Sequence, residues 1–244
     1  MAFTPVVLWP LTLAALLNYA LTTQSTTTLT TLIICSSREA FLQALLHTAQ
    51  RQESKEADSL QQLITPTLHN LFTTQNVNVA FCGSVQTLLA HLSALKLTPC
   101  CGIDGERSAL RLVLVNPLAL HAPTPSYSAQ GLSRTFAAAV ETAFNLNAEL
   151  MVVECLGMRR EDRLYDEDDL DAAMADAEEG GRSEANEEDP WNQEVPILNV
   201  SARRFGSGTG ERAWAGRTIK ARRVAGRWFR FQQTEGLQDP GGAA

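Results

Sequence analysis

Two short apolar runs, LRLVLVNPLAL at residues 110–120 and ELMVVEC at residues 149–155, decide the fold of this sequence. Between them, residues 132–146 carry apolar side chains at i, i+4, i+8, i+11 and i+12, the spacing of one helix face. Strands that are apolar on both faces belong to a parallel sheet covered by helices, and a strand–helix–strand unit crosses over right-handed. Residues 109–155 are therefore predicted to form a β–α–β unit.

The rest of the chain alternates between helix and strand patterns. Further strands are predicted at 29–35 and 76–82, and helices at 11–21, 40–50, 60–73 and 85–95. Such alternation is typical of an α/β fold of three layers with a mostly parallel sheet. Apolar alternation returns at 195–200, and residues 218–231 (TIKARRVAGRWFRF) are predicted to form a β-hairpin that turns at Ala225 and Gly226 and closes the sheet.

The charges divide the chain into segments. The 244 residues have a formal charge of −7, yet residues 161–189 contain 14 acidic and 2 basic residues, and residues 203–230 contain 9 basic and 1 acidic. A segment so acidic and so poor in large apolar residues does not bury enough surface to offset its ordering entropy. We therefore expect a core at 1–158, a disordered acidic insertion at 159–194, a C-terminal part of the same domain at 195–234, and a disordered tail at 235–244.

Cysteine usage and the N-terminus indicate the compartment. The five cysteines are odd in number and show no C-x-x-C spacing, so a reducing compartment and no zinc site are expected. The apolar stretch 6–21 is short, is interrupted by Pro10 and Asn18, and has no Lys or Arg before it. It is therefore predicted to be neither a membrane span nor a signal peptide.

The order of the elements resembles the RecA-type core of eukaryotic recombinases and their paralogues. The matching features are the strand LVLVNPLAL, the loop with Ser126, Tyr127 and Ser128, the helix opening at Gly131, and the strand ELMVVE. The run LTTLIICSSREAFLQALL is similar to the strand and helix that follow the family's nucleotide site, and TIKARRVAGRWFRF to its closing hairpin. The resemblance is one of pattern and order.

The sequence departs from that family at its nucleotide site. A phosphate-binding loop needs glycines, whose backbone N–H groups cradle the phosphates, and a lysine that reaches them. Here the first glycine is Gly83 and the first lysine is Lys55, both beyond the position of the loop. Asn116, or the neighbouring Pro117, stands where the family keeps its magnesium-associated Asp, and a neutral amide does not balance Mg²⁺ charge. The resemblance therefore implies a protein without bound nucleotide, cofactor or catalytic activity.

Two non-catalytic groups fit this description. One is the accessory subunits of Shu-type complexes, which bind DNA and support the recombinase filament in homologous recombination. The other is the RecA-like accessory subunits of Elongator, which form a ring in tRNA modification. The loop at 126–128 and the helix after it favour the first group. Membership of the first group implies that the protein forms a hetero-oligomer with another RecA-like subunit and acts in DNA repair. It also implies a location in the nucleus, with the cytoplasm as the alternative. The uncharged helix at 11–21 is expected to be buried, in its own core or against that subunit.

The basic C-terminal segment is the candidate nucleic-acid site. Cations that neutralise phosphates there, interleaved with aromatic residues, are Arg217, Lys220, Arg222, Arg223, Arg227 and Arg230. In a strand, Arg222 and Arg223 would point to opposite faces, so a solvated hairpin face is the alternative. A third possibility is that the acidic insertion folds back over this segment. Trp228 is expected to pack in the core.

Other polar residues give weak signals. The four histidines share no ligand spacing and are predicted to be ordinary surface or boundary residues. Glu154 ends a strand at the edge of the sheet where α/β proteins bind ligands. It has no paired acid or histidine nearby in sequence, so it is a weak catalytic candidate.

Overall fold

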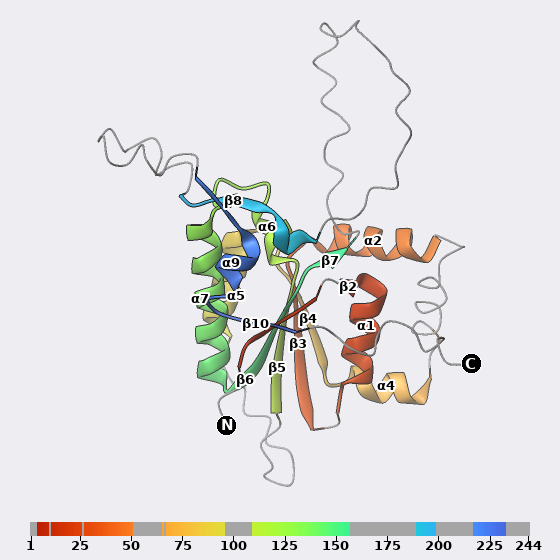
Figure 1. The fold of residues 1–244 in the computed structure, drawn as a ribbon. Coiled ribbons are helices and arrows are strands. Elements are labelled where there is room, and N and C mark those ends of the chain that lie inside the picture. The colour runs from red at the N-terminus through yellow and green to blue at the C-terminus, as the bar shows by residue number, and fades with distance from the viewer. Residues whose placement is uncertain are drawn as a thin grey trace, which may run out of the picture.

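A six-stranded parallel sheet forms the centre of the molecule (Figure 1). A computed structural model describes residues 4–9, 11–25, 27–50, 65, 67–95, 109–156, 189–198 and 217–232. Within these ranges the strand order is β10-β1-β6-β5-β3-β4, and every neighbouring pair is parallel. Helices cover both faces, which confirms the predicted α/β fold of three layers.

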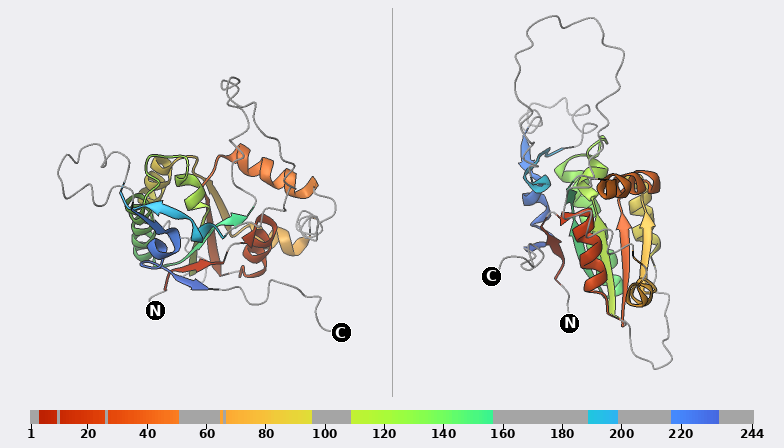
Figure 2. Two further views of the ribbon diagram at one scale, coloured as in Figure 1. Left: turned by 45° about the horizontal axis from the view of Figure 1, so that its top comes forward. Right: turned by 90° about the vertical axis from the view of Figure 1, so that its right-hand side faces the viewer.

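The elements divide into the sheet, two helical layers and short additions at the carboxyl edge. The strands of the sheet are β1 (Val6–Leu8), β3 (Thr28–Ile34), β4 (Val77–Phe81), β5 (Ala109–Val115), β6 (Ala148–Val153) and β10 (Arg230–Gln232). One face carries α1 (Leu13–Thr22), α2 (Arg38–Gln50) and α4 (Leu68–Thr74), and the other α5 (Val85–Ala94), α7 (Ala129–Leu146) and α9 (Ala221–Ala225) (Figures 1 and 2). The additions are β2 (Leu11–Thr12), α6 (Pro117–His121), β7 (Cys155–Leu156), the 3₁₀ helix η1 (Pro190–Asn192), β8 (Glu194–Pro196) and β9 (Thr218–Lys220).

The central strands are apolar on both faces because each face has its own core. Successive side chains of a strand point to opposite faces. On β5, Leu112 and Leu114 pack with α5 and α7, whereas Val113 and Val115 pack with α1 and α2. The predicted β–α–β unit at 109–155 is thus confirmed, with α7 as its crossover helix.

Two residues fix the start of α7. The hydroxyl of Ser128 accepts a hydrogen bond from the N–H of Gly131 at 3.0 Å, which caps the helix. A Cβ atom at Gly131 would lie 2.0 Å from the carbonyl oxygen of Ser126. Glycine is therefore required where the preceding loop crosses the helix.

The predicted start of the first helix was wrong. The helix expected at 11–21 begins at Leu13, and a strand that the sequence did not reveal, β1, precedes it. In the apolar run at 110–120, β5 ends at Val115, because Asn116 has a φ of 59° and turns the chain out of the sheet. Pro117 then begins α6, in the position where a helix tolerates proline.

The predicted hairpin at 218–231 was also wrong. Ala221, Val224 and Ala225 are buried at the i, i+3, i+4 spacing of a helix, and they form α9. The strands on either side do not pair with each other: β9 is antiparallel to β8, and β10 is parallel to β1. Arg222 and Arg223 therefore lie on a helix, not on opposite faces of a strand.

The expected acidic insertion includes residues that are folded in the structure. Trp191 is fully buried, with ring centroids 6.5 Å from Phe136 and 5.5 Å from Phe231. The described part of the chain resumes at Asp189, whose carboxylate accepts the N–H of Trp191 at 3.0 Å. The rest of the predicted insertion, the predicted tail, the loop before α4 and the loop before β5 lie outside the described residues.

Candidate functional site

The connections that leave the carboxyl edge of the sheet lie on both faces. After β1 the chain enters α1 on one face, whereas after β5 it enters α7 on the other face (Figure 1). In open α/β sheets, ligands bind where neighbouring connections leave in opposite directions. A ligand of this sheet would therefore meet the residues directly after β1, β5 and β6.

The connection after β1 is short. Only four residues separate Leu8 from Leu13, and none of them is glycine. Two of the four form β2, which pairs in parallel with β7, with Leu11 opposite Cys155 and Thr12 opposite Leu156. The phosphate-binding loop of nucleotide-binding proteins has eight residues with two glycines and a lysine, and this connection does not match that pattern.

The polar side chains that end β5 and β6 hold backbone groups. Asn116 is 2% exposed, and its Oδ1 accepts the N–H of Cys155 at 2.5 Å. Glu154 is 3% exposed, and its Oε1 accepts the N–H of Leu118 at 2.6 Å. Each side chain therefore connects the end of one strand to the segment that follows the neighbouring strand, and the two bonds hold the carboxyl ends of β5 and β6 together.

The cysteines at this edge are buried thiols. Cys35, Cys82 and Cys155 are free and buried, as expected for cysteine used as a small hydrophobe. Burial raises the pKa of Cys35 and of Cys155, and the nearby charge of Glu154 raises both further. The reactive thiolate is therefore disfavoured. Within the described ranges, no three His, Cys, Asp or Glu side chains are grouped closely enough to hold a metal ion.

His121 does not lie at the surface, contrary to the prediction. Its side chain is fully buried at the end of α6, where Nε2 lies 2.9 Å from the hydroxyl of Thr135 and Nδ1 lies 3.4 Å from the carbonyl oxygen of Ser126. Burial lowers the pKa of His121, and the Ser126 carbonyl opposes this shift. The neutral imidazole ring therefore links α6 to the following loop and to α7.

His121 should make the protein less stable in mild acid. Its pKa is lowered from 6.5 on folding, so below about pH 6.5 the unfolded chain binds more protons than the folded one. The free energy of unfolding should then decrease as the pH is lowered, by at most about 1.4 kcal/mol per pH unit for this one group. Urea titrations between about pH 7.5 and 5.5 would measure the decline.

Replacing His121 by Gln should flatten that decline. His47→Gln is the matched control, because His47 lies exposed in α2. An unchanged decline in the His121→Gln protein would show that other groups cause the acid sensitivity.

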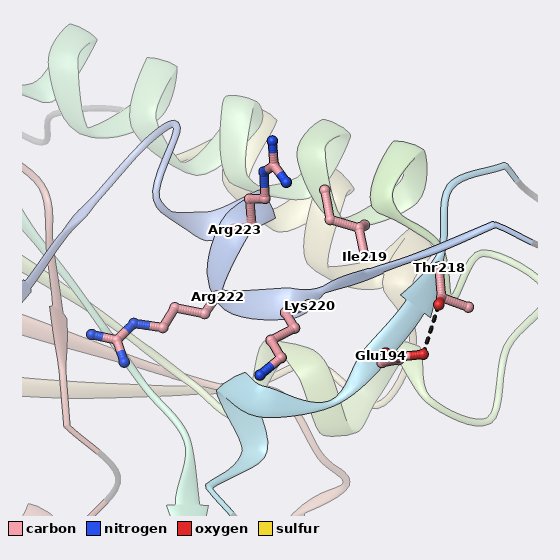
Figure 3. A pocket seen from close by; sticks show the side chains of 6 residues that line it. All are labelled: Glu194, Thr218, Ile219, Lys220, Arg222 and Arg223. Carbon is pink, nitrogen blue, oxygen red and sulfur yellow. Dashed lines mark hydrogen bonds between the residues drawn. The ribbon is translucent and has the colours of Figure 1, made fainter.

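The structure brings three of the six cations proposed for nucleic-acid binding to one open hollow of about 410 Å³, and these are Lys220, Arg222 and Arg223. The side chains of Lys220 and Arg222 point to the same side, whereas that of Arg223 points away from them (Figure 3). The hollow is also lined by Thr218, Ile219 and Glu194. Its acid, Glu194, accepts a hydrogen bond from the Thr218 hydroxyl at 2.6 Å.

The other cations do not line this hollow. Arg230 begins β10 opposite Val6, which pairs with Met151 in the middle of β6. Arg227 is exposed in the turn between α9 and β10, and Arg217 is exposed just before β9. The hollow therefore holds three of the six residues.

Two aromatic residues that the sequence did not associate with the site surround Arg222. The centre of its guanidinium lies 5.1 Å from the ring centroid of Trp9 and 4.9 Å from that of Phe231. Both rings are half-buried, and they come from the segment after β1 and from β10. No local pattern pairs these residues, because only the β1–β10 contact brings them together. Trp228, by contrast, packs against the core, in agreement with the prediction.

Comparison with known proteins identifies no family for the chain. No protein-family model matches the sequence, and no curated protein matches it. Among solved structures, an isolated ATPase domain matches with a TM-score of 0.36 and 13% identity, over 62% of this chain and 57% of that chain. A DnaB-like replicative helicase, described with its interactions with primase, matches with a TM-score of 0.32 and 12% identity, over 62% and 38%.

Both matches cover less than two thirds of the solved chains, and at these scores neither indicates a ligand for this protein. Within the described ranges, no helix combines the length and apolar character needed to cross a membrane.

Proposed function

We propose that this protein is a non-catalytic RecA-like subunit of an accessory complex for homologous recombination. In this proposal it works by assembling with another RecA-like subunit and by binding DNA, and not by turning over nucleotide. The pairing of β2 with β7 is the observation that supports it most, because strand contacts take the place of a phosphate-binding loop. Asn116 and Glu154 add to this, since their side-chain oxygens bind backbone N–H groups of the same edge.

The distribution of exposed apolar residues supports assembly with a partner. The apolar helix α1 buries Leu13, Leu16 and Ala20 in its own core, so it is not the partner surface. Six large apolar residues are instead exposed on α2, α4 and the edge strand β4, and these are Leu42, Leu46, Leu68, Leu71, Phe72 and Val79. An exposed apolar group at a sheet edge is typical of an interaction surface. Three of them, Leu68, Leu71 and Phe72, lie at i, i+3 and i+4 on α4, directly before the edge strand β4, and we refer to these three residues as the β4-edge surface.

An Elongator-type structural subunit is the second candidate. Such a subunit needs assembly but no DNA-binding surface of its own. The position of Arg217, Arg227 and Arg230 outside the hollow favours it, because a strong phosphate-binding surface would group all six cations. This alternative places the protein in the cytoplasm, and the first candidate places it in the nucleus.

The purified protein should not hydrolyse ATP. Phosphate release should remain at the level of buffer, because the four residues between β1 and α1 include no glycine or lysine to bind the phosphates. The measurement needs a control variant that alters the surface only, and Phe144→Ala serves this purpose, since Phe144 is 82% exposed on α7. Turnover that is lost in Asn116→Ala and retained in Phe144→Ala would overturn the proposal.

Proteins that co-purify with the full chain should separate the two candidates. Recombinase paralogues would support the first, and Elongator subunits the second. Phe72→Ser on α4 should abolish the association, because Phe72 is 67% exposed in the β4-edge surface. Phe144→Ser is the matched control on α7. A partner that is retained by both variants would show that the β4-edge surface is not the interface.

A further inference from the structure

We propose that Arg222 and Lys220 form a binding site for phosphoryl oxygens, in which Trp9 and Phe231 hold the Arg222 guanidinium in place. The ligand is a phosphate group, supplied either by the backbone of a nucleic-acid strand or by a free polyphosphate. The inference rests on the DNA-binding part of the proposed function, and it assigns that binding to two of the six candidate cations.

The guanidinium of Arg222 is positioned but not neutralised. Its centre lies within cation–π range of two rings, at 5.1 Å from Trp9 and 4.9 Å from Phe231. Aromatic rings take none of the N–H donors that a guanidinium offers to a carboxylate or phosphate. Among the described residues, no carboxylate pairs with the Arg222 side chain. The donors of a fixed cation are therefore left for a ligand.

The two rings are themselves fixed relative to each other. The backbone N–H of Trp9 donates to the carbonyl oxygen of Gln232 at 3.1 Å, which continues the pairing of β1 with β10. The ring of Phe231 also contacts the buried Trp191, at a centroid distance of 5.5 Å. Arg222 thus loses side-chain conformational entropy when the protein folds, so less of this entropy remains to be lost when an anion binds.

Lys220 supplies the second charge of the site. It is exposed, it ends β9 directly before α9, and its side chain points to the same side as that of Arg222 (Figure 3). The carboxylate of Glu194 lies toward the Thr218 end of the hollow, where it accepts the Thr218 hydroxyl. An anion is therefore favoured at the Arg222–Lys220 end and disfavoured at the other.

Phosphate fits this site better than the carboxylates of an acidic peptide. An arginine fork binds either group. However, cations beside partly exposed aromatic rings are the combination by which proteins bind nucleic-acid strands, since the rings offer stacking surface to bases. Trp9 and Phe231 provide that surface next to Arg222 and Lys220. Binding of an acidic peptide is tested below by competition with poly-glutamate.

The test compares Arg222→Lys with Arg227→Lys in the full chain. Binding of a fluorescein-labelled oligothymidylate is followed by anisotropy at several salt concentrations. Arg222→Lys keeps the charge but removes the planar fork, so affinity should fall about tenfold, while the slope of log affinity against log salt stays unchanged. Arg227→Lys should change affinity less than about twofold, because Arg227 lies exposed in the turn after α9.

A second pair of variants tests the rings without altering any charge. Trp9→Leu should weaken oligothymidylate binding several-fold, because Arg222 loses one of the rings that orient it. Trp9→Tyr should restore most of the affinity, since it retains an aromatic face. Thermal unfolding of each variant shows whether the protein remains folded.

Competitors identify the source of the phosphate and the result that overturns the inference. Displacement by inorganic tripolyphosphate at matched phosphate concentration would indicate a free polyphosphate ligand, whereas its failure to compete would indicate a strand backbone. The inference is wrong if Arg222→Lys binds like Arg227→Lys, or if poly-glutamate competes as well as the oligonucleotide. If Arg222→Lys binds like Arg227→Lys, the DNA-binding part of the proposed function remains valid. An absence of any binding removes both the inference and the DNA-binding part of the proposed function, but not the assembly with a partner.

Discussion

Replacing Trp191 by alanine should lower the free energy of unfolding by about 3–5 kcal/mol, the usual cost of removing a large buried aromatic ring. The indole is fully buried between Phe136 of α7 and Phe231 of β10. It therefore connects the segment at 189–198 to the helical layer and to the sheet edge. Urea denaturation followed by circular dichroism would measure the loss.

Phe144→Ala is the control for this substitution. Phe144 lies on the same helix as Phe136 but is 82% exposed, so its removal should change stability by less than about 0.5 kcal/mol. A Trp191→Ala protein as stable as the control would show that residues 189–198 do not pack on α7. The described path of the chain into β8 and α9 would then be wrong.

Introducing a carboxylate at position 116 should also destabilise the protein strongly. Asn116→Asp keeps the shape of the side chain and its bond to the N–H of Cys155, but it places a charge at a position that is 2% exposed. The carboxyl group of Glu154 ends the neighbouring strand and is also buried. A buried charge without a partner costs about 3–5 kcal/mol, and we expect a loss of that size.

The chain contains a matched control for this change. Asn147 is the other non-glycine residue with a positive φ among those described, at 51° compared with 59° for Asn116, but it is exposed at the end of α7. Asn147→Asp therefore adds the same charge in the same backbone conformation, and it should cost less than about 0.5 kcal/mol. If Asn116→Asp were tolerated and stabilised by Mg²⁺, this edge of the sheet would accept a cation next to the new carboxylate, and the expected cost of a buried, unpaired charge would be wrong.

The central part of the fold was predictable because its signal is periodic. The apolar faces of α7 and the continuous apolar strands β5 and β6 recur over many residues, and each points to a covered parallel sheet. The errors fall on elements of three to five residues. Val6–Leu8 is too short for a period, and α9 is a little over one turn within an alternating run of arginine and aromatic residues. The conformation of those segments depends on tertiary pairing, of β1 with β6 and β10 and of β9, directly before α9, with β8.

The candidate site was predictable in its composition but not in its arrangement. The basic segment is visible in the sequence, yet its division into cations that line the hollow and cations that do not, such as Arg227 and Arg230, depends on α9 being a helix. Trp9 lies far from this segment in sequence, and nothing near it indicates contact with Arg222. For Asn116, the missing charge was evident from the residue type. Its left-handed conformation and its bond to Cys155 were not, because both depend on the neighbouring strand.

The position of β1 in the sheet has a consequence for how the protein is made. Val6 pairs with Met151 on one side and with Arg230 on the other, so β1 leaves the ribosome long before either of its neighbours. At about 5–20 residues per second, its second neighbour follows roughly ten seconds or more after it. Throughout that interval an uncharged, largely apolar segment that precedes Arg38 must avoid other nascent chains. Expression should therefore depend on chaperones that bind the emerging segment of β1 and α1, and contacts of such long sequence separation should make folding slow.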